Sequence, residues 1–403
     1  MCATQSNVGT EQRHLPNCRF SQHHVVGSKW GTVLLTQSTF NRPEGFSMQS
    51  DFVVWDASDP ADYQAWLEFW DLSPHREVAS HPDYANLFKG EADRALCAAY
   101  HGKSGSVLYS FILRDIPDSV FERTSLTDIT TPYGYGGPLA WNSPSIEDLA
   151  AQFWPLFDAW ARTRGVVTEF IRFGLFPDMY LPYPGETVCR SKNIVRTLQL
   201  DEESMFMTFE SKVRKNVKKA RRNGLSVLID ETGSHLTEFL NIYHSTMDRR
   251  GANEGYYFSR PFFEALQNKL PGSFIYAHIL FEDKIISSEL VLVSKDSAYS
   301  FLGGTDKDAF DLRPNDYLKY EIIRWAKSQG KQHFVLGGGA SPGDGIERYK
   351  RSFAPDGSVD FITGQRILLP DVYNELSRRS QTDATEGELP TAPAFFPEYR
   401  RTI

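Results

Sequence analysis

The chain has 403 residues, which is more than one hydrophobic core usually serves, so two domains are expected. Apolar residues make up 41% of the chain and charged residues 23%, a composition that is typical of folded proteins and excludes a disordered one. The 43 basic residues stand against 51 acidic ones, and the net charge of −8 excludes a protein that binds nucleic acid over its whole surface.

Residues 1–47 are rich in small polar residues without a sustained period, and we expect a flexible leader there. A first domain is expected over residues 48–200. Asp59 followed by Pro60 predicts the start of a helix, because aspartate caps free N–H groups and proline suits the first turn. The expected elements of this domain are a strand over 52–56, a helix over 60–70, a β-hairpin over 94–113, a helix over 146–164 and strands near 168–173 and 194–200.

The second half repeats this order of elements, which predicts a second domain over residues 201–369. Residues 370–403 are expected to form a C-terminal segment that is loose after residue 380. Two similar units, each with a mixed, mostly antiparallel sheet flanked by helices, predict an α+β fold. The expected elements of the second unit are helices over 206–223, 235–250, 261–270 and 315–329, a strand over 225–230, a three-stranded meander over 273–302, and strands over 333–336 and 359–369.

The sequence carries no signal for a membrane span, a disulfide framework or a metal site. No apolar run approaches the ~18 residues that a span needs, and the N-terminus lacks the charged-then-apolar pattern of an export signal. The four cysteines lie far apart with no C-x-x-C pair, and the histidines are scattered. We therefore expect no metal and a location in the reducing cytoplasm.

The most unusual stretch is a basic helix, in which residues 212–222 contain no acid and seven cations: Lys212, Arg214, Lys215, Lys218, Lys219, Arg221 and Arg222. Apolar residues recur every three or four positions and predict one buried stripe, formed by Phe206, Phe209, Val213, Val217 and Ala220. Gly224 suits the end of the helix. Like charges four residues apart repel each other, and an otherwise acidic chain tolerates that repulsion here. We therefore interpret the helix as a surface for a polyanion, either nucleic acid or a phosphorylated substrate, rather than as an ordinary solvated face.

Two glycine-rich loops are candidates for ligand contact. Residues 132–138 combine glycines, which allow close backbone approach, with tyrosines, although a simple bend of the chain would also explain them. Residues 336–345 place successive glycines after a strand, where free N–H groups can hold an anion. The candidate substrate-binding residues in the two loops are Tyr133, Tyr135, Gly136, Gly137, Gly338 and Gly339.

Together these motifs resemble the Fem family over roughly residues 50–370. Its C-terminal unit is similar to the basic helix ending in NGLSV, the YLKYEIIRWA segment at 317–326, LGGG at 336–339 and YKRSF at 349–353. Its first unit is similar to HPDY at 81–84 and PYGYGGP at 132–138. Unlike the cell-wall enzymes with long coiled-coil arms, this chain has no room for a hairpin arm after residue 212.

The resemblance implies two GNAT-like domains in tandem and an enzyme that forms amide bonds. Fem enzymes move an amino acid from aminoacyl-tRNA to an amine, here on a peptidoglycan precursor or a small metabolite, with aminoacyl-tRNA as co-substrate and no further cofactor. Aminolysis of an activated ester needs an aligned carbonyl and a stabilised oxyanion but no covalent nucleophile. This requirement agrees with the lack of a convincing Ser-His-Asp or Cys-His arrangement.

The resemblance also suggests roles for individual residues. Lys350 matches the family motif and is the cation expected near the reacting carbonyl. Arg260 and Lys89 are expected to hold phosphate of the acceptor or of the tRNA. Asp128, ahead of the tyrosine-glycine loop, is a candidate for orienting or deprotonating the amine, or else a turn cap.

Two alternatives remain open at this stage. The first is an acyl-CoA-dependent N-acyltransferase, since GNAT enzymes usually hold the CoA pyrophosphate on a turn that opens a helix. In this chain Asp306, Asp308 and Asp311 occupy that region and would repel pyrophosphate, which favours tRNA as the donor. The second is a non-catalytic RNA-binding protein, which is disfavoured because simple phosphate contact does not require the two glycine-rich loops. The sequence leaves the amino acid, the acceptor and the oligomeric state open.

Overall fold

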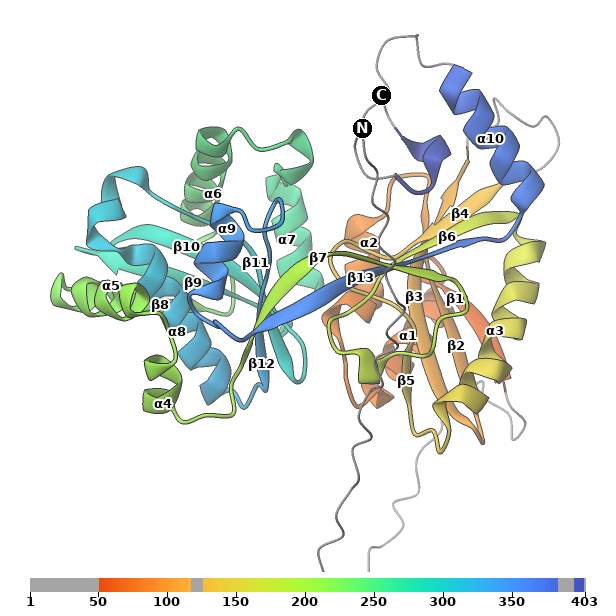
Figure 1. The fold of residues 1–403 in the computed structure, drawn as a ribbon, viewed down its shortest axis with the longest axis horizontal. Helices are drawn as coiled ribbons and strands as arrows, with labels where there is room; N and C mark the ends of the chain where they lie inside the picture. Colours follow the sequence, from red (N-terminus) through yellow and green to blue (C-terminus); the bar gives the residue numbers. More distant parts are fainter. Residues whose placement is uncertain (1–50, 117–125, 383–394, 402–403) are drawn as a thin grey trace, which may run out of the picture. The chain divides into compact units, whose positions relative to one another are not determined.

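The computed structural model of the chain describes residues 51–116, 126–382 and 395–401 (Figure 1). The expected leader over 1–47 lies outside these ranges. The strands of the first half are β1 (Asp51–Asp56), β2 (Arg94–Gly102), β3 (Gly105–Asp115), β4 (Thr127–Thr130), β5 (Leu139–Trp141), β6 (Val166–Arg172) and β7 (Glu186–Thr197). Its helices are α1 (Pro60–Leu72), α2 (Pro82–Phe88) and α3 (Ile146–Thr163), with short 3-10 helices at Val78–Ser80 and Pro177–Met179.

The described residues of the second half form the strands β8 (Ser226–Asp230), β9 (Phe274–Phe281), β10 (Lys284–Val293), β11 (Ser297–Thr305), β12 (His333–Gly338) and β13 (Ser358–Ile367). Its helices are α4 (Glu202–Met207), α5 (Ser211–Arg222), α6 (Leu236–Arg250), α7 (Arg260–Lys269), α8 (Pro314–Ser328), α9 (Gly345–Arg351) and α10 (Pro370–Thr382). Short 3-10 helices lie at Glu254–Tyr256, Lys307–Leu312 and Glu398–Arg400. None of the helices in the described ranges is both long and apolar enough to cross a bilayer.

The strands of the described ranges form one sheet in the order β1-β2-β3-β4-β6-β13-β7-β12-β11-β10-β9-β8, with β5 beside β3. Its two halves are joined by an exchange of strands, which Figure 1 shows at β7 and β13. β13, from the second half, pairs antiparallel with both β6 and β7, and β7 pairs antiparallel with β12. The expected α+β class is confirmed. The domain limits 48–200 and 201–369 remain a prediction, because the exchange ties the two halves into one sheet.

Local signals in the first half are confirmed by the backbone. The Asp59 carboxylate accepts hydrogen bonds from the N–H groups of Ala61 (2.8 Å) and Asp62 (3.1 Å), and Pro60 occupies the first turn of α1. The β2–β3 hairpin has Gly102 opposite Gly105, as the apolar runs and the intervening turn predicted. Both signals are short-range, so they do not depend on distant packing.

The basic helix is shorter than expected, because the predicted helix over 206–223 is interrupted between α4 and α5. Phe209, at the interruption, is 1% exposed and packs against Phe353 at a ring distance of 5.6 Å. The backbone N–H of Glu210 donates to the Ser352 carbonyl at 2.9 Å instead of continuing a helix. These long-range contacts take precedence over the local helical pattern. The stripe of Val213, Val217 and Ala220 is buried as predicted.

The C-terminal segment is not loose throughout. Phe396 packs against Tyr373 of α10 at a ring distance of 6.0 Å, and the Tyr399 hydroxyl lies 2.7 Å from the Thr168 hydroxyl on β6. Residues 395–401 therefore lie against the first half of the sheet, in contrast to the expectation for the chain after residue 380. The signal that sequence reasoning missed is the spacing of Phe396 and Tyr399 in an otherwise polar segment.

Phe209 is expected to be a main anchor of the basic helix. Replacing it with alanine should lower the free energy of unfolding by about 3–5 kcal/mol, because a buried ring is removed and a cavity remains. The control is Met207→Ala, three-fifths exposed at the end of α4, which should change stability by less than about 0.5 kcal/mol. Urea-induced unfolding followed by circular dichroism measures both changes. Equal effects of the two substitutions would contradict the assignment of Phe209 as the anchor.

Candidate active site

Lys350 lies on α9, directly after the second glycine-rich loop. Asp344 caps this helix by accepting the N–H of Glu347 at 2.7 Å. From the last turn the half-buried Lys350 side chain reaches back, and its Nζ donates to the Gly338 carbonyl at 2.7 Å. Gly337 has φ +82°, and a Cβ at this position would lie 3.2 Å from Lys350 Nζ. Glycine therefore allows the strand end to turn and leaves room for the ammonium group.

The structure brings Lys350 together with Tyr135, which lies more than two hundred residues earlier in the sequence. The position of a Cβ on Gly337 would also be 3.9 Å from Tyr135 Oη and 4.0 Å from Asn193 Oδ1. The Tyr135 ring packs against Tyr299 at a ring distance of 5.6 Å. Burial raises the pKa of the Tyr135 phenol, so its hydroxyl stays protonated and can donate a hydrogen bond. Asn193 was not expected from the sequence.

A buried ion pair that sequence reasoning missed lies beside this group. Lys319 Nζ, on α8, is 2.6 Å from both carboxylate oxygens of Glu289 on β10 and 2.9 Å from Ser300 Oγ. Both residues of the pair are less than one-tenth exposed. A lysine on the apolar face of α8, within the YLKYE segment, was the available signal, because a buried lysine needs a partner.

The pKa of Lys350 falls to about 8 because burial disfavours its charged form and the positive charge of Lys319 repels it, while Glu289 partly opposes this shift. At neutral pH the side chain is still mostly protonated. It therefore provides a cation that can stabilise negative charge forming nearby. Its pKa is also close enough to neutrality for the amine to exchange a proton with a reacting group.

Tyr133, at the other end of the tyrosine-glycine loop, belongs to an exposed aromatic cluster. Its ring stacks on Phe88 at 5.6 Å and meets the edges of Phe301 (6.0 Å) and Phe258 (6.5 Å). The Tyr84 hydroxyl holds the loop by donating to the Tyr133 carbonyl at 2.9 Å. Tyr133 is 42% exposed, so one face of the cluster is open to a ligand.

Lys89 and Arg260 flank this aromatic cluster. Lys89 follows Phe88 at the end of α2, and Arg260 begins α7, which directly follows Phe258 and Ser259. Arg260 is already engaged, since it donates to Thr237 Oγ1 at 3.0 Å and lies 3.5 Å from the Glu264 carboxylate. Lys89 is partly exposed, and its role in holding phosphate stays a prediction.

The glycines of the first loop have a different explanation from the one expected. The N–H of Gly136 donates to the Arg172 carbonyl at 2.7 Å, and a Cβ on this residue would lie 3.0 Å from the Thr131 side chain. A Cβ on Gly137 would lie 3.0 Å from the Phe173 ring and 3.1 Å from the Tyr180 ring. Both glycines are buried, so close packing within the protein accounts for them, and contact with a ligand stays a prediction.

The second glycine-rich loop already holds an anion of its own. The Asp344 carboxylate accepts the N–H groups of Ala340 (2.7 Å) and Ser341 (3.2 Å). A Cβ on Gly339 would come within 2.4 Å of Asp344 Oδ1, which explains the glycine there. These N–H groups are therefore not free for a ligand. Gly338 contributes instead through its carbonyl, which accepts the Lys350 ammonium group.

Asp128 is a buried structural carboxylate and not an accessible base. It is 0% exposed, and its oxygens lie 2.7 Å from Arg114 Nε and 2.8 Å from Arg400 Nε. The Tyr399 hydroxyl donates to it at 3.1 Å. Its oxygens thus accept from three donors, and two of these, Tyr399 and Arg400, attach the C-terminal segment to β4. The structure thus gives Asp128 a different role from the one expected for it.

The basic helix α5 packs against α8 and exposes most of its cations. Arg214 donates to the Met207 carbonyl at 2.8 Å, and Arg221 lies 3.3 Å from the Glu321 carboxylate and over the Tyr320 ring. These two arginines therefore stabilise the fold. The others are exposed or half-exposed on the helix surface: Lys212, Lys215, Lys218, Lys219 and Arg222.

The start of α5 meets the end of α9. The Glu210–Ser352 backbone hydrogen bond joins the residue before α5 to the residue after α9. α9 itself carries Arg348 and Arg351 in addition to Lys350. Arg351 pairs with the Glu347 carboxylate and Arg348 donates to the Gly343 carbonyl, so both arginines have partners within the protein.

The region expected to hold CoA pyrophosphate in a GNAT enzyme is acidic, and its Asp306 carboxylate already has partners within the protein. Asp306 accepts the N–H of Asp308 at 3.1 Å and lies 3.3 Å from Lys284 Nζ. A carboxylate thus occupies a backbone donor that a pyrophosphate would require.

We expect Lys350 to be half deprotonated near pH 8, because its pKa is lowered to about that value. The rate at which a small reagent acylates the Lys350 amine should rise with pH, with a midpoint near pH 8. Mass spectrometry of the peptide that contains Lys350 measures this rate. Glu289→Gln should move this midpoint to lower pH, since a negative neighbour is lost and the repulsion from Lys319 remains. A midpoint in the ordinary lysine range, about 10.4, would contradict the burial of the ammonium group.

Sequence comparison identifies two similarities. Residues 209–351 match the family described as an acetyltransferase (GNAT) domain. The chain is 24% identical over 187 residues to the UDP-N-acetylmuramoylpentapeptide-lysine N(6)-alanyltransferase of Weissella viridescens. The aligned region covers 44% of this chain and 52% of that protein. The chain therefore spans about half the length of this curated relative.

Structure comparison identifies the fold. The crystal structure of FemX has a TM-score of 0.57 at 13% identity, covering 77% of this chain and 97% of that one. A conserved protein of unknown function from Bacteroides thetaiotaomicron VPI-5482 has a TM-score of 0.51 at 12% identity, covering 76% and 97%. The matched domain and the sequence similarity agree with the predicted resemblance to the Fem family, and the fold is similar to that of FemX.

Proposed function

We propose that this protein is an aminoacyltransferase that moves an amino acid from aminoacyl-tRNA to an amine acceptor and forms an amide bond. The observation that carries the proposal is the position of Lys350, beside Tyr135 and the Gly338 carbonyl, in the last turn of α9, whose C-terminal end meets the residue before the basic helix α5. The similarity to an alanyltransferase supports this class of reaction.

The cation and the hydroxyl group at the site fit the steps of an aminolysis reaction. A neutral acceptor amine attacks the ester carbonyl of the donor, so that an N–C bond forms and the carbonyl oxygen becomes negative. The Lys350 ammonium and the Tyr135 hydroxyl are the donors placed to stabilise this oxyanion. When the intermediate collapses, the ester C–O bond breaks, and the proton lost by the amine passes to the terminal ribose oxygen of the tRNA. The lowered pKa of Lys350 would allow this side chain to mediate the transfer.

The two substrates would bind on different surfaces. The exposed cations of α5 suit the phosphate backbone of the tRNA, and α9 would lead the aminoacyl end towards Lys350. The aromatic cluster at Tyr133 and Phe88, with Lys89 beside it, suits an acceptor that carries a planar group and a phosphate. A peptidoglycan precursor with a free amine combines these properties, and a tRNA donor implies a cytoplasmic reaction.

The role of α5 is tested by replacing Lys215, Lys218 and Lys219 with glutamate in one variant. Its affinity for aminoacyl-tRNA should fall. The slope of the logarithm of the binding constant against the logarithm of the salt concentration should become less steep by about three, because about three phosphate contacts disappear. Filter binding between low and physiological salt measures both quantities.

The matched control makes the same charge change on the first half, at the exposed residues Lys103, Arg162 and Arg164. This control variant should bind tRNA like the unmodified protein. Equal losses in both variants would show that only the net charge matters. Full transfer from acyl-CoA in a nuclease-treated assay would instead assign the alternative donor.

Lys350→Met is expected to lower turnover by at least about tenfold with little change in tRNA affinity, because it removes a donor that acts mainly in the transition state. Lys350→Arg keeps the positive charge and should retain part of the activity. Single-turnover rates with radiolabelled aminoacyl-tRNA measure both effects. Unchanged turnover of Lys350→Met would remove this residue from the mechanism.

A further inference from the structure

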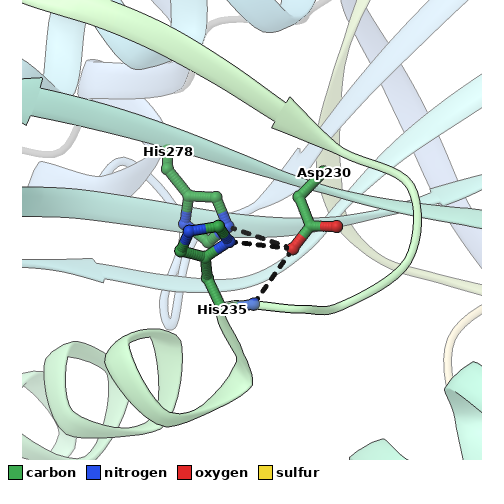
Figure 2. Close-up of side chains that lie close together, drawn as sticks. All are labelled: Asp230, His235 and His278. Carbon is green, nitrogen blue, oxygen red and sulfur yellow. Dashed lines mark hydrogen bonds and ion pairs between the residues drawn. The ribbon is translucent and has the colours of Figure 1, made fainter.

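A second group of polar side chains lies where β8 ends and uses none of the residues around Lys350. Asp230 is the last residue of β8, His235 directly precedes α6, and His278 lies on β9. Figure 2 shows both imidazole rings beside the Asp230 carboxylate, with dashed lines from His235 and His278 to one of its oxygens. Backbone elements that are separate in the sequence thus present two nitrogens and one oxygen to each other.

The spacing of these atoms is close to that of ligands around one ion. Asp230 Oδ2 lies 3.5 Å from His235 Nδ1 and 3.9 Å from His278 Nε2, and one atom from each of the three residues lies within 4.8 Å of the others. Ligands of a tetrahedral zinc ion, each about 2.0–2.2 Å from the metal, are about 3.4 Å apart. Small side-chain movements would therefore bring all three into coordination distance.

His278 Nε2 points into this group without a hydrogen-bond partner. The residue is 0% exposed, and within the described ranges Nε2 has no partner, since 3.9 Å from Asp230 is too long for a hydrogen bond. The other ring nitrogen, Nδ1, is 2.8 Å from Ser288 Oγ, which fixes the ring orientation. A buried ring nitrogen without a partner is destabilising, and a cation would satisfy it.

The carboxylate of Asp230 is held charged and in position by its own loop. Oδ1 accepts Thr232 N (2.9 Å), Thr232 Oγ1 (2.7 Å) and Gly233 N (2.9 Å). Oδ2, which faces the imidazoles, accepts the longer bonds from Ser234 Oγ and His235 N, both at 3.1 Å. Hydrogen bonds of this kind orient carboxylate ligands in metal sites.

We propose that Asp230, His235 and His278 bind a divalent transition-metal ion, with Zn²⁺ as the natural candidate. Two imidazoles and a carboxylate suit zinc better than magnesium or calcium, which prefer oxygen ligands alone. The His235 side chain is 38% exposed, so an ion can reach the group from solvent. The ion would replace the Ser234 hydroxyl, which now lies 3.0 Å from His235 Nδ1, and water would complete the coordination. The ion would join the start of α6 to β9, which is a structural role independent of the transfer reaction.

The test is titration of the metal-free full-length protein with ZnCl₂ by isothermal calorimetry and with CoCl₂ by visible absorption. We expect one zinc ion per chain, a four-coordinate cobalt spectrum and a higher melting temperature with zinc. His278→Ala and His235→Ala should each weaken zinc binding by at least about tenfold, since each removes a ligand. The control is His244→Ala in α6, whose histidine lies 3.2 Å from the Phe258 carbonyl outside the group. This control variant should bind zinc like the unmodified protein.

Two outcomes would overturn the proposal. The first is a lack of zinc binding by the unmodified protein at micromolar concentrations. The second is zinc binding that neither histidine variant changes. His278→Ala removes a fully buried ring, and if this variant is unfolded, His235→Ala at the partly exposed histidine decides the outcome. Circular dichroism identifies which variants are folded, and transfer activity is not needed as a readout.

Discussion

The pairing of β13 with both β6 and β7 is the constraint on which the candidate active site depends. α9 and Lys350 immediately precede β13, so the position of that strand determines where the ammonium group lies. The tyrosine-glycine loop is attached to the end of β6, because the Gly136 N–H donates to the Arg172 carbonyl. In turn, the Phe173 N–H donates to the Ile362 carbonyl of β13 at 3.0 Å. Through these bonds the exchanged strand brings Tyr135 and Lys350 to the same place.

The buried pair of Lys319 and Glu289 is better explained by electrostatics at the site than by stability. Taking two charges out of water is unfavourable, and a buried pair often contributes no net stability relative to apolar residues. In this position, however, the pair acts on Lys350: Lys319 lowers its pKa and Glu289 limits the shift. The net result is a lysine that is still cationic at neutral pH but close to the point of proton exchange. Burial near a balanced ion pair therefore adjusts the pKa of this lysine.

Sequence reasoning succeeded where the determinants are local and failed where they are distant. The cap at Asp59, the β2–β3 hairpin and the buried stripe of α5 follow from residues a few positions apart. The interruption at Phe209 could not be predicted in this way, because it depends on Phe353 and Ser352. The same holds for Asp128, whose partners Arg114 and Arg400 come from β3 and the C-terminal segment.

The site itself was predictable in part. Lys350, Tyr135 and Gly338 were expected from motifs, and the structure brings them together. The glycines at 136 and 137 were assigned to ligand contact, although close packing against Thr131, Phe173 and Tyr180 explains them. A glycine pattern shows that a Cβ is not tolerated, but it does not show whether a ligand or another part of the chain occupies the space.

Because β7 and β13 pair with strands of the opposite half, the two halves of the chain must be inherited together. If the gene were split between β7 and α4, β6 and β7 would lose the neighbour between them, and β12 would lose β7. Strand edges opened in this way would favour aggregation. Neither half can be lost, or transferred alone to another gene, without exposing such an edge. Substitutions in one half are therefore tolerated only if its strands still pair with those of the other half.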